Sequence, residues 1–261
     1  MKKTVLAASF ALSLTIPTYA DTLAGIYIGG QIWQNEASGE FGESGEQANF
    51  NFSDEQQGSF YVAFEHPLPF IPNAKIASTS LSTEGFTTLD REISFDNKTF
   101  AMGSEVNANF DVSYIDYTLY YELFDNGLFS FDLGITGRDF DGDVSLSARS
   151  NIAPAGQEPT YINVSGTIAT DEIVPMLYAS TIVGLPFTGF NVFAEGNFLS
   201  IDDHTLYDYQ VGVSYEVIDN PVVDLNLTAG YRSVKLELED LNDLYTNIDF
   251  QGIFVGAIVH F

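Results

Sequence analysis

The sequence contains no cysteine, a single tryptophan and only nine basic residues in 261 positions. The lack of cysteine excludes thiol nucleophiles, thiolate metal sites and disulfide scaffolds. The nine Lys and Arg stand against 36 Asp and Glu. The resulting net charge of −27 excludes a protein that binds bare nucleic acid, because phosphates attract the opposite sign. Aromatic residues make up 14%, which is too many for an acidic disordered tail.

The first twenty residues have the composition of a secretory signal peptide. Lys2 and Lys3 give a positive start, residues 4–16 form an apolar stretch without charge, and small residues end at Ala20. The stretch is shorter than the roughly 20 residues that a membrane-spanning helix needs. We therefore interpret residues 1–20 as a signal peptide that is cleaved after Ala20, and residues 21–261 as one exported domain.

Beyond the signal peptide, the dominant period of the sequence is two. Within residues 206–217, for example, Tyr207, Tyr209 and Val211 alternate with polar or small residues. Such alternation is typical of strands with one apolar face. The pattern predicts ten strands, near residues 22–34, 58–65, 74–83, 107–123, 128–138, 172–185, 190–200, 206–217, 222–234 and 248–261.

The links between these strands alternate in length. Short links contain the Gly, Pro, Asn or Asp that tight turns require, whereas residues 35–57, 84–106, 139–171 and 235–247 form long polar links. This asymmetry is typical of outer-membrane barrels, whose closure leaves no unpaired strand edge in the lipid. We therefore predict an all-β fold, a ten-stranded antiparallel transmembrane β-barrel with short periplasmic turns and long acidic outer loops. Eight to twelve strands are compatible with the pattern, and a soluble exported β-sandwich is the competing fold.

The final strand ends on an aromatic residue. Val255, Ala257, Val259 and Phe261 share one apolar face, and a closing Phe resembles the signal by which outer-membrane barrels are recognised for assembly. We therefore expect three partners: the barrel-assembly machinery, the lipid of the outer membrane and its lipopolysaccharide.

Several other stretches resemble a family of small Gram-negative outer-membrane β-barrel proteins. They are Glu65–Asn73, Tyr120–Asn126, Gly230–Ser233 and the closing residues Gly252–Phe261. The resemblance covers nearly the whole chain after residue 20 and is strongest at the turns. Because this family has no established activity, the resemblance implies location and fold only, and we transfer no site residue from it.

Ionisable residues occupy many positions that alternate with the apolar ones, so they should point into the lumen of the barrel. We call them the lumen polar cluster: Glu65, Asp116, Glu122, Asp132, Arg138, Glu195, Asp208, Glu216, Asp224 and Arg232. Two interpretations are open. The cluster is either a hydrogen-bonded plug that holds the barrel rigid, or the lining of a narrow path whose acidic groups favour cations.

The strongest enzymatic hypothesis rests on Asp202 and His204. Omptin-type outer-membrane proteases use an Asp-x-His pair that faces an Asp-x-Asp pair, and Asp139, Asp141 and Asp143 supply the second spacing. Such spacings arise by chance in a chain with 36 acidic residues, so we assign no catalytic residue. The three aspartates also lack the full ligand pattern of a calcium loop, and we assign no metal site.

The sequence thus predicts a non-catalytic integral outer-membrane barrel without a cofactor. Its function is structural, or it forms a narrow cation-favouring pore, or it binds a small solute. A surface protease and a soluble exported binding protein are the alternatives. Divalent cations that bridge the acidic loops to lipopolysaccharide phosphates are a further candidate partner.

Overall fold

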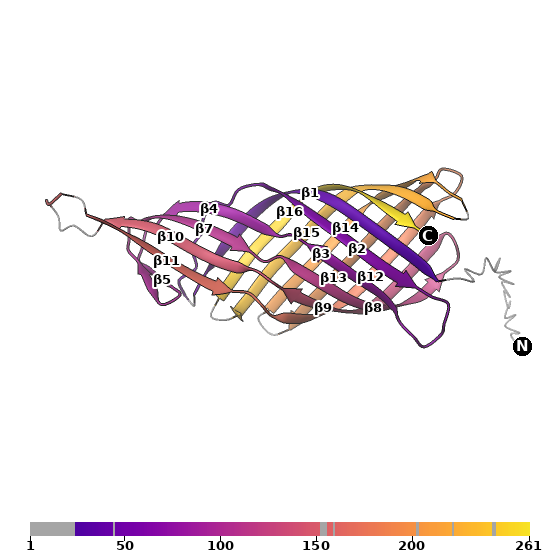
Figure 1. Ribbon diagram of the computed structural model, residues 1–261, viewed down its shortest axis with the longest axis horizontal. Helices are drawn as coiled ribbons and strands as arrows, with labels where there is room; N and C mark the ends of the chain where they lie inside the picture. Colours follow the sequence, from indigo (N-terminus) through magenta and orange to yellow (C-terminus); the bar gives the residue numbers. More distant parts are fainter. Residues whose placement is uncertain are drawn as a thin grey trace, which may run out of the picture.

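Ten strands pair antiparallel into a closed barrel, and a smaller sheet extends from one end of it (Figure 1). The computed structural model describes residues 24–43, 45–151, 156–158, 160–201, 204–220, 222–241 and 244–261. The predicted signal peptide lies outside these residues, as do Asp202 and Asp203. The described part of the chain holds no helix that is long and apolar enough to cross a membrane.

Each barrel strand pairs with the barrel strands before and after it in the sequence, and the first closes on the last. The closing seam runs from the pair Tyr27–His260 to the pair Gly42–Tyr245. This arrangement confirms the predicted all-β, ten-stranded antiparallel barrel. The strands are β1 (Gly25–Gly42), β2 (Glu55–Glu65), β3 (Asn73–Thr79), β8 (Tyr114–Asp125), β9 (Phe129–Phe140), β12 (Ile173–Leu185), β13 (Phe190–Ile201), β14 (His204–Ile218), β15 (Asp224–Leu241) and β16 (Leu244–His260).

The outward face of the barrel wall is apolar. Ile32, Val255 and Ile135, on β1, β16 and β9, are 53%, 60% and 65% exposed. In a sandwich these side chains would be buried against a second sheet. A large exposed apolar surface that surrounds a closed sheet is instead the surface that lipid covers in membrane-spanning barrels. The wall is therefore of the transmembrane type.

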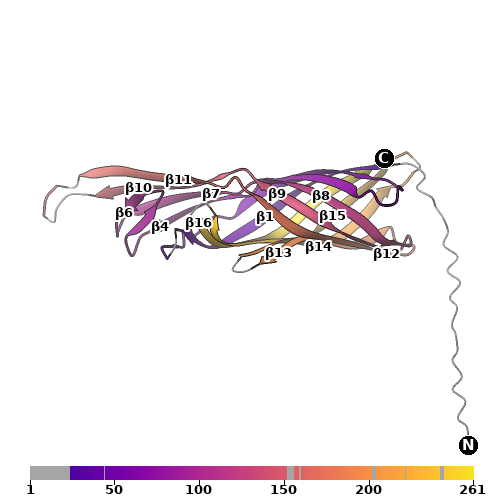
Figure 2. The ribbon, with the colours of Figure 1, turned by 90° about the horizontal axis from the view of Figure 1, so that it is seen from below.

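Four barrel strands continue beyond the wall as a second sheet. β4 (Ser82–Thr88) follows β3, and β7 (Glu105–Asp111) precedes β8. β10 (Asp143–Asn151) follows β9, and β11 (Tyr161–Ala169) precedes β12. Their order, β4-β7-β10-β11, repeats the order β3-β8-β9-β12 in the wall. Figure 2 shows this outer sheet as a narrow extension along the long axis of the molecule. We call this end of the barrel the sheet end, and the opposite end the turn end.

The outer sheet occupies residues that the sequence pattern assigned to links. Residues 139–171, predicted as a polar link, hold β10 and β11 of the outer sheet. Residues 84–106, also predicted as a polar link, hold parts of β4 and β7 and a separate two-stranded hairpin. The strand predicted at 74–83 ends at Thr79, and the strand predicted at 107–123 is divided between β7 and β8. Beyond the wall the outward positions are polar, so the period of two no longer shows an apolar outward face. For this reason the segment resembles a loop in the sequence.

The other two long links are also shorter than predicted. β1 continues to Gly42, within the predicted link 35–57, and β15 continues to Leu241. Only two residues separate β15 from β16, whereas the sequence pattern predicted a link over 235–247. The physical reason is the same, because Glu36, Glu40 and other polar residues take the outward positions of these extensions.

A hydrophobic core fills the barrel at the sheet end. Its side chains come from the inward positions of the long strands, from the outer sheet and from residues 48–52. A hairpin of β5 (Ile93–Phe95) and β6 (Lys98–Phe100) adds more apolar side chains. The largest fully buried members are Trp33, Phe41, Phe50, Phe95, Phe100, Phe110, Phe140, Phe250, Leu81, Ile93 and Leu146. The lumen is therefore closed by packed side chains at this end.

Candidate functional site

Alternation along the strands places polar side chains inside the barrel, between the hydrophobic core and the turn end. On β8, for example, Ile115 and Tyr117 point outward, so Asp116 between them points into the lumen and is buried. Arg138 on β9 is completely buried as well. The closed wall thus brings residues that are distant in the sequence, such as Asp116 and Arg232, into one layer.

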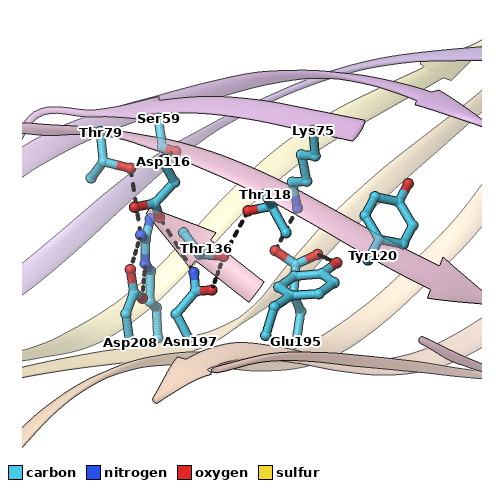
Figure 3. Close-up of polar contacts among 12 residues, drawn as sticks. Ser59, Lys75, Thr79, Asp116, Thr118, Tyr120, Thr136, Glu195, Asn197 and Asp208 are labelled. Carbon is cyan, nitrogen blue, oxygen red and sulfur yellow. Dashed lines mark hydrogen bonds and ion pairs between the residues drawn. The ribbon is translucent and has the colours of Figure 1, made fainter. Parts of the chain in front are cut away.

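Two arginines and two aspartates form the centre of this layer, and Figure 3 labels the aspartates, Asp116 and Asp208. Arg138 donates to Asp116 through Nε (2.8 Å) and Nη2 (2.7 Å), and Nη2 also donates to Asp208 Oδ2 (2.8 Å). Arg232 donates to both oxygens of Asp208, at 2.9 Å and 2.7 Å. The two positive and two negative charges balance. Arg138–Asp116 and Arg232–Asp208 are bidentate pairs, a geometry that gives strong ion pairs. We call these four residues the Arg–Asp network.

Aromatic rings surround the Arg–Asp network on the side of the core. The Arg138 guanidinium lies 3.6 Å from the ring centre of Tyr114, and that of Arg232 lies 5.2 Å from the Trp33 ring. The Tyr114 hydroxyl donates to Asp208 and accepts from Arg232. The rings attract the cations and shield the ion pairs from water on the side of the core, whereas Asp116, Asp208 and Arg232 also line a cavity on the other side.

Neutral polar groups continue the network around the wall. Asn197 on β13 donates to Asp116 (3.3 Å) and accepts from the Thr136 hydroxyl (2.7 Å). Thr136 in turn shares a hydrogen bond of 2.8 Å with Thr118. The network thus joins β8, β9, β13, β14 and β15, so that it cross-links both sides of the barrel.

A second group of polar residues lies nearer the turn end (Figure 3). Lys75 pairs with Glu195 at 2.6 Å, and its ammonium lies 4.4 Å from the ring centre of Tyr61 and 5.7 Å from that of Tyr178. The ammonium is therefore enclosed by one carboxylate and two rings. In the same region the Tyr120 hydroxyl donates to Glu65 at 2.7 Å.

A cavity of about 160 Å³ lies between these groups. Its lining includes Lys75, Glu195 and Arg232, and it reaches Ser214 and Ile182 towards the turn end. Ile182 points inward from β12, like the buried Tyr178 and Ser180, but is 45% exposed to solvent. The interior is thus accessible to solvent at the turn end and filled at the sheet end. Such a cavity is open at one end only.

The structure brings part of the lumen polar cluster together and leaves the rest apart. Asp116, Arg138, Asp208 and Arg232 form the Arg–Asp network described above. Glu195 and Glu65 belong to the group around Lys75, while Asp132 lies opposite Glu122 on the neighbouring strand, closer to the turn end. Asp224 contacts His260 at 3.2 Å, and Glu216, half-buried, lies on β14 at the turn end.

Sequence reasoning missed several neutral residues that complete the site. They are Tyr61, Tyr178, Asn197, Thr118 and Thr136. The signal that could have found them is position, because each lies two or four residues from an inward-pointing residue of its own strand. Their residue types gave no signal, because Tyr, Thr and Asn are common in both faces of a barrel strand.

The predicted assembly residues lie on the outward face of the closing strand. Val255 and Phe261 are exposed, whereas Ala257 and Val259 are half-buried. The backbone N–H of Phe261 donates to the Ile26 carbonyl at 3.0 Å, and the N–H of Ile26 donates to the Phe261 carbonyl at 3.2 Å. Phe261 thus extends the seam between β16 and β1 by one residue.

The protease hypothesis finds little support in the described geometry. His204 accepts a backbone hydrogen bond from Glu239 through Nδ1 at 3.3 Å. Asp139 lies next to the last residue of β9, and two strands, β12 and β13, separate β9 from β14. Among the described residues, no three His, Asp or Glu side chains are grouped in a way that could hold a metal ion.

The fold and its interior define the class of protein: a membrane-spanning β-barrel whose lumen is filled at one end. No protein-family model and no curated protein sequence matches the chain. Among solved structures it is similar to Neisserial surface protein A, at 12% identity with a TM-score of 0.29, over 90% of this chain and 96% of that chain.

Two further solved structures are similar to the chain at comparable sequence identity and TM-score. A FadL homologue from Pseudomonas aeruginosa has 8% identity and a TM-score of 0.36, with 91% of this chain and 90% of that chain covered. The transport unit of the autotransporter AIDA-I from Escherichia coli has 9% identity and a TM-score of 0.28, with 96% and 93% covered. Similarity this distant assigns no function to the chain.

Proposed function

We propose that the protein is a non-catalytic structural barrel of the Gram-negative outer membrane, with a lumen that is closed towards the outside. In this orientation the sheet end lies outside the cell and the turn end faces the periplasm. The apolar wall, the expected signal peptide and the assembly residues ending at Phe261 support the location. Its role is to hold the outer sheet rigidly above the membrane.

The observation that carries this proposal is the change in lumen filling along the barrel axis. Near the outside the inward positions are buried aromatic and aliphatic side chains, including Phe110 and Phe250. A hydrated ion that crossed this region would lose its water without gaining polar partners, which is prohibitively costly. Below it, the Arg–Asp network links opposite walls. Together they favour the rigid-plug interpretation over the narrow cation-favouring pore.

Conductance in planar lipid bilayers tests the closed lumen directly. We expect the wild-type protein to insert without current steps at voltages that leave the bilayer intact. Replacing both Phe110 and Phe250 with Ser removes two core rings, and any opening should appear as new current steps in this variant alone. Stable cation-selective conductance of the wild type would contradict the proposal and restore the pore interpretation.

A further inference from the structure

The outer sheet has two faces of different chemistry. One face is buried and carries Val106, Phe110 and Leu146 in the core. The other is exposed to solvent, and we call it the outer-sheet face. Residues paired across the strands form three rows on it: Glu84–Asn109–Ser145–Thr167, Phe86–Asn107–Ser147–Ser165 and Thr88–Glu105–Arg149–Asn163.

The centre of the outer-sheet face consists of amide and hydroxyl groups. Asn107, Asn109, Ser145 and Ser147 occupy the middle of the two central strands. In the described part of the chain these four side chains hydrogen-bond no other protein group, so their donors and acceptors are free for a ligand. None of these four side chains is acidic although the protein carries a net charge of −27, and Glu84 and Glu105 lie beside them in the rows.

Two aromatic rings flank this neutral centre on the edge strands. Phe86 on β4 is 48% exposed, and Tyr161 on β11 is 50% exposed. The Arg149 guanidinium lies 4.2 Å from the ring centre of Tyr161, which restrains that ring. Exposed rings beside hydroxyl and amide groups can contact the C–H faces of sugars, while the polar groups bond to sugar hydroxyls.

The edge of β4 is already occupied by residues 50–53. Phe86 N–H donates to the Phe50 carbonyl, and Ser53 N–H donates to the Glu84 carbonyl at 2.8 Å. An extended peptide cannot therefore add to this edge as another strand. The core behind the sheet keeps the rows in register, so a ligand meets a preformed surface.

The outer-sheet face lies on the same side of the strands as the lipid-facing wall. Outward Ile135 on β9 is followed, beyond the break between the strands at Asp141 and Gly142, by outward Ser145 and Ser147 on β10. The nine residues of β10 extend about 30 Å at the usual rise of a strand. In the proposed orientation the face therefore points sideways into the sugar layer carried by the neighbouring lipids.

We propose that the outer-sheet face binds the uncharged sugar chains of the lipopolysaccharide that surrounds the barrel. Charge favours this occupant, because an anionic polymer is repelled by the acidic protein and a cationic one finds no acid at the centre of the face. An apolar partner would leave the amides and hydroxyls without hydrogen bonds. The inference rests on the proposed location in the outer membrane, but not on a closed lumen.

The test uses the full chain in detergent and sugar chains released by mild acid from the lipopolysaccharide of the producing cells, freed of lipid and of charged fragments. Heparin is the anionic comparison and dextran the unrelated neutral one. We expect saturable binding to the released neutral chains in calorimetry, and none to heparin. No binding to those chains, preferential binding to heparin or equal binding to dextran would each overturn the proposal.

Three variants locate the binding surface. Phe86→Ala and Tyr161→Ala should each weaken binding about five- to tenfold, the usual contribution of one aromatic contact. Asn107→Asp keeps the shape of the side chain but removes its donors and adds a charge, so it should also weaken binding. Phe187→Ala, a matched loss of an exposed ring in the β12–β13 turn, should bind like the wild type.

Retention of the folded electrophoretic mobility in unheated detergent samples shows that each variant still forms a barrel. If all three variants fold and bind with wild-type affinity, the outer-sheet face is not the binding surface. Conductance by the wild type would contradict the closed lumen but would leave this binding result unchanged, so the two proposals fail separately.

Discussion

The two halves of the lumen differ although the same strands line both. Towards the sheet end the inward positions of β15 are Val234, Leu236 and Leu238, all buried in the core. Towards the turn end the same strand carries Arg232, Thr228 and Asp224, and the exposure of the inward positions increases. The closed barrel thus combines a dry, protein-like interior with a wet cavity. The same kind of interaction should therefore contribute more to the free energy of unfolding in the dry half than in the wet half.

The largest effect is expected where charge is buried most deeply, at the completely buried Arg138. Arg138→Ala leaves Asp116 without its arginine partner beside the core, while Asp208 keeps Arg232. The change should lower the free energy of unfolding by about 3–5 kcal/mol. Urea unfolding of the barrel in lipid vesicles measures this loss. Lys235→Ala is the control, because Lys235 is partly exposed and only loosely paired, at 3.6 Å and 3.8 Å. It should cost at most about 1 kcal/mol.

Removing one ring from the dry half should have a slightly smaller effect. Phe110→Ala leaves a cavity among Phe41, Phe52 and Phe250, whose ring centres lie within 6.4 Å of its own. We expect a loss of about 3 kcal/mol in the same unfolding assay. An unchanged stability would mean that the outer sheet does not share a core with the barrel.

In the wet half, loss of an ion pair should lower the free energy of unfolding less than in the dry half. Lys75→Ala removes the cation beside Glu195, but that carboxylate is 27% exposed and water from the cavity can solvate it. The expected loss is about 1–2 kcal/mol, below that of Arg138→Ala. Equal losses for the two variants would show that the halves of the lumen do not differ in hydration.

The sequence pattern predicted the wall of the barrel well because the membrane imposes a simple rule on it. Outward positions must be apolar, as in Ile253 and Val255, so strand positions and the direction of Asp116, Arg138, Asp208 and Arg232 follow from alternation. Beyond the membrane this rule no longer applies. The outward positions of β7 and β10 are Asn, Ser, Asp and Glu with one Arg, and the strands resemble polar loops.

The pairing inside the lumen could not be derived from alternation. The pattern shows that Glu195 and Arg138 point inward but does not give their height or distance across the barrel. Closure of the barrel fixes the register of all ten strands. Only this register determines that Glu195 pairs with Lys75 and that Asp116 pairs with Arg138. The hydrophobic core was missed for a related reason, since Leu236 and Leu238 lay in a segment that was interpreted as a polar link.

In the proposed orientation, the lumen is open to the periplasm and closed to the outside. Because the chain has no cysteine, single introduced thiols report on accessibility without background. Ser214→Cys lines the cavity towards the turn end, and Thr246→Cys lies inward and buried at the sheet end. We expect a small membrane-impermeant maleimide to label Ser214→Cys from the periplasmic side and Thr246→Cys from neither side. Rapid labelling of Thr246→Cys in the folded barrel would show that the core does not close the lumen.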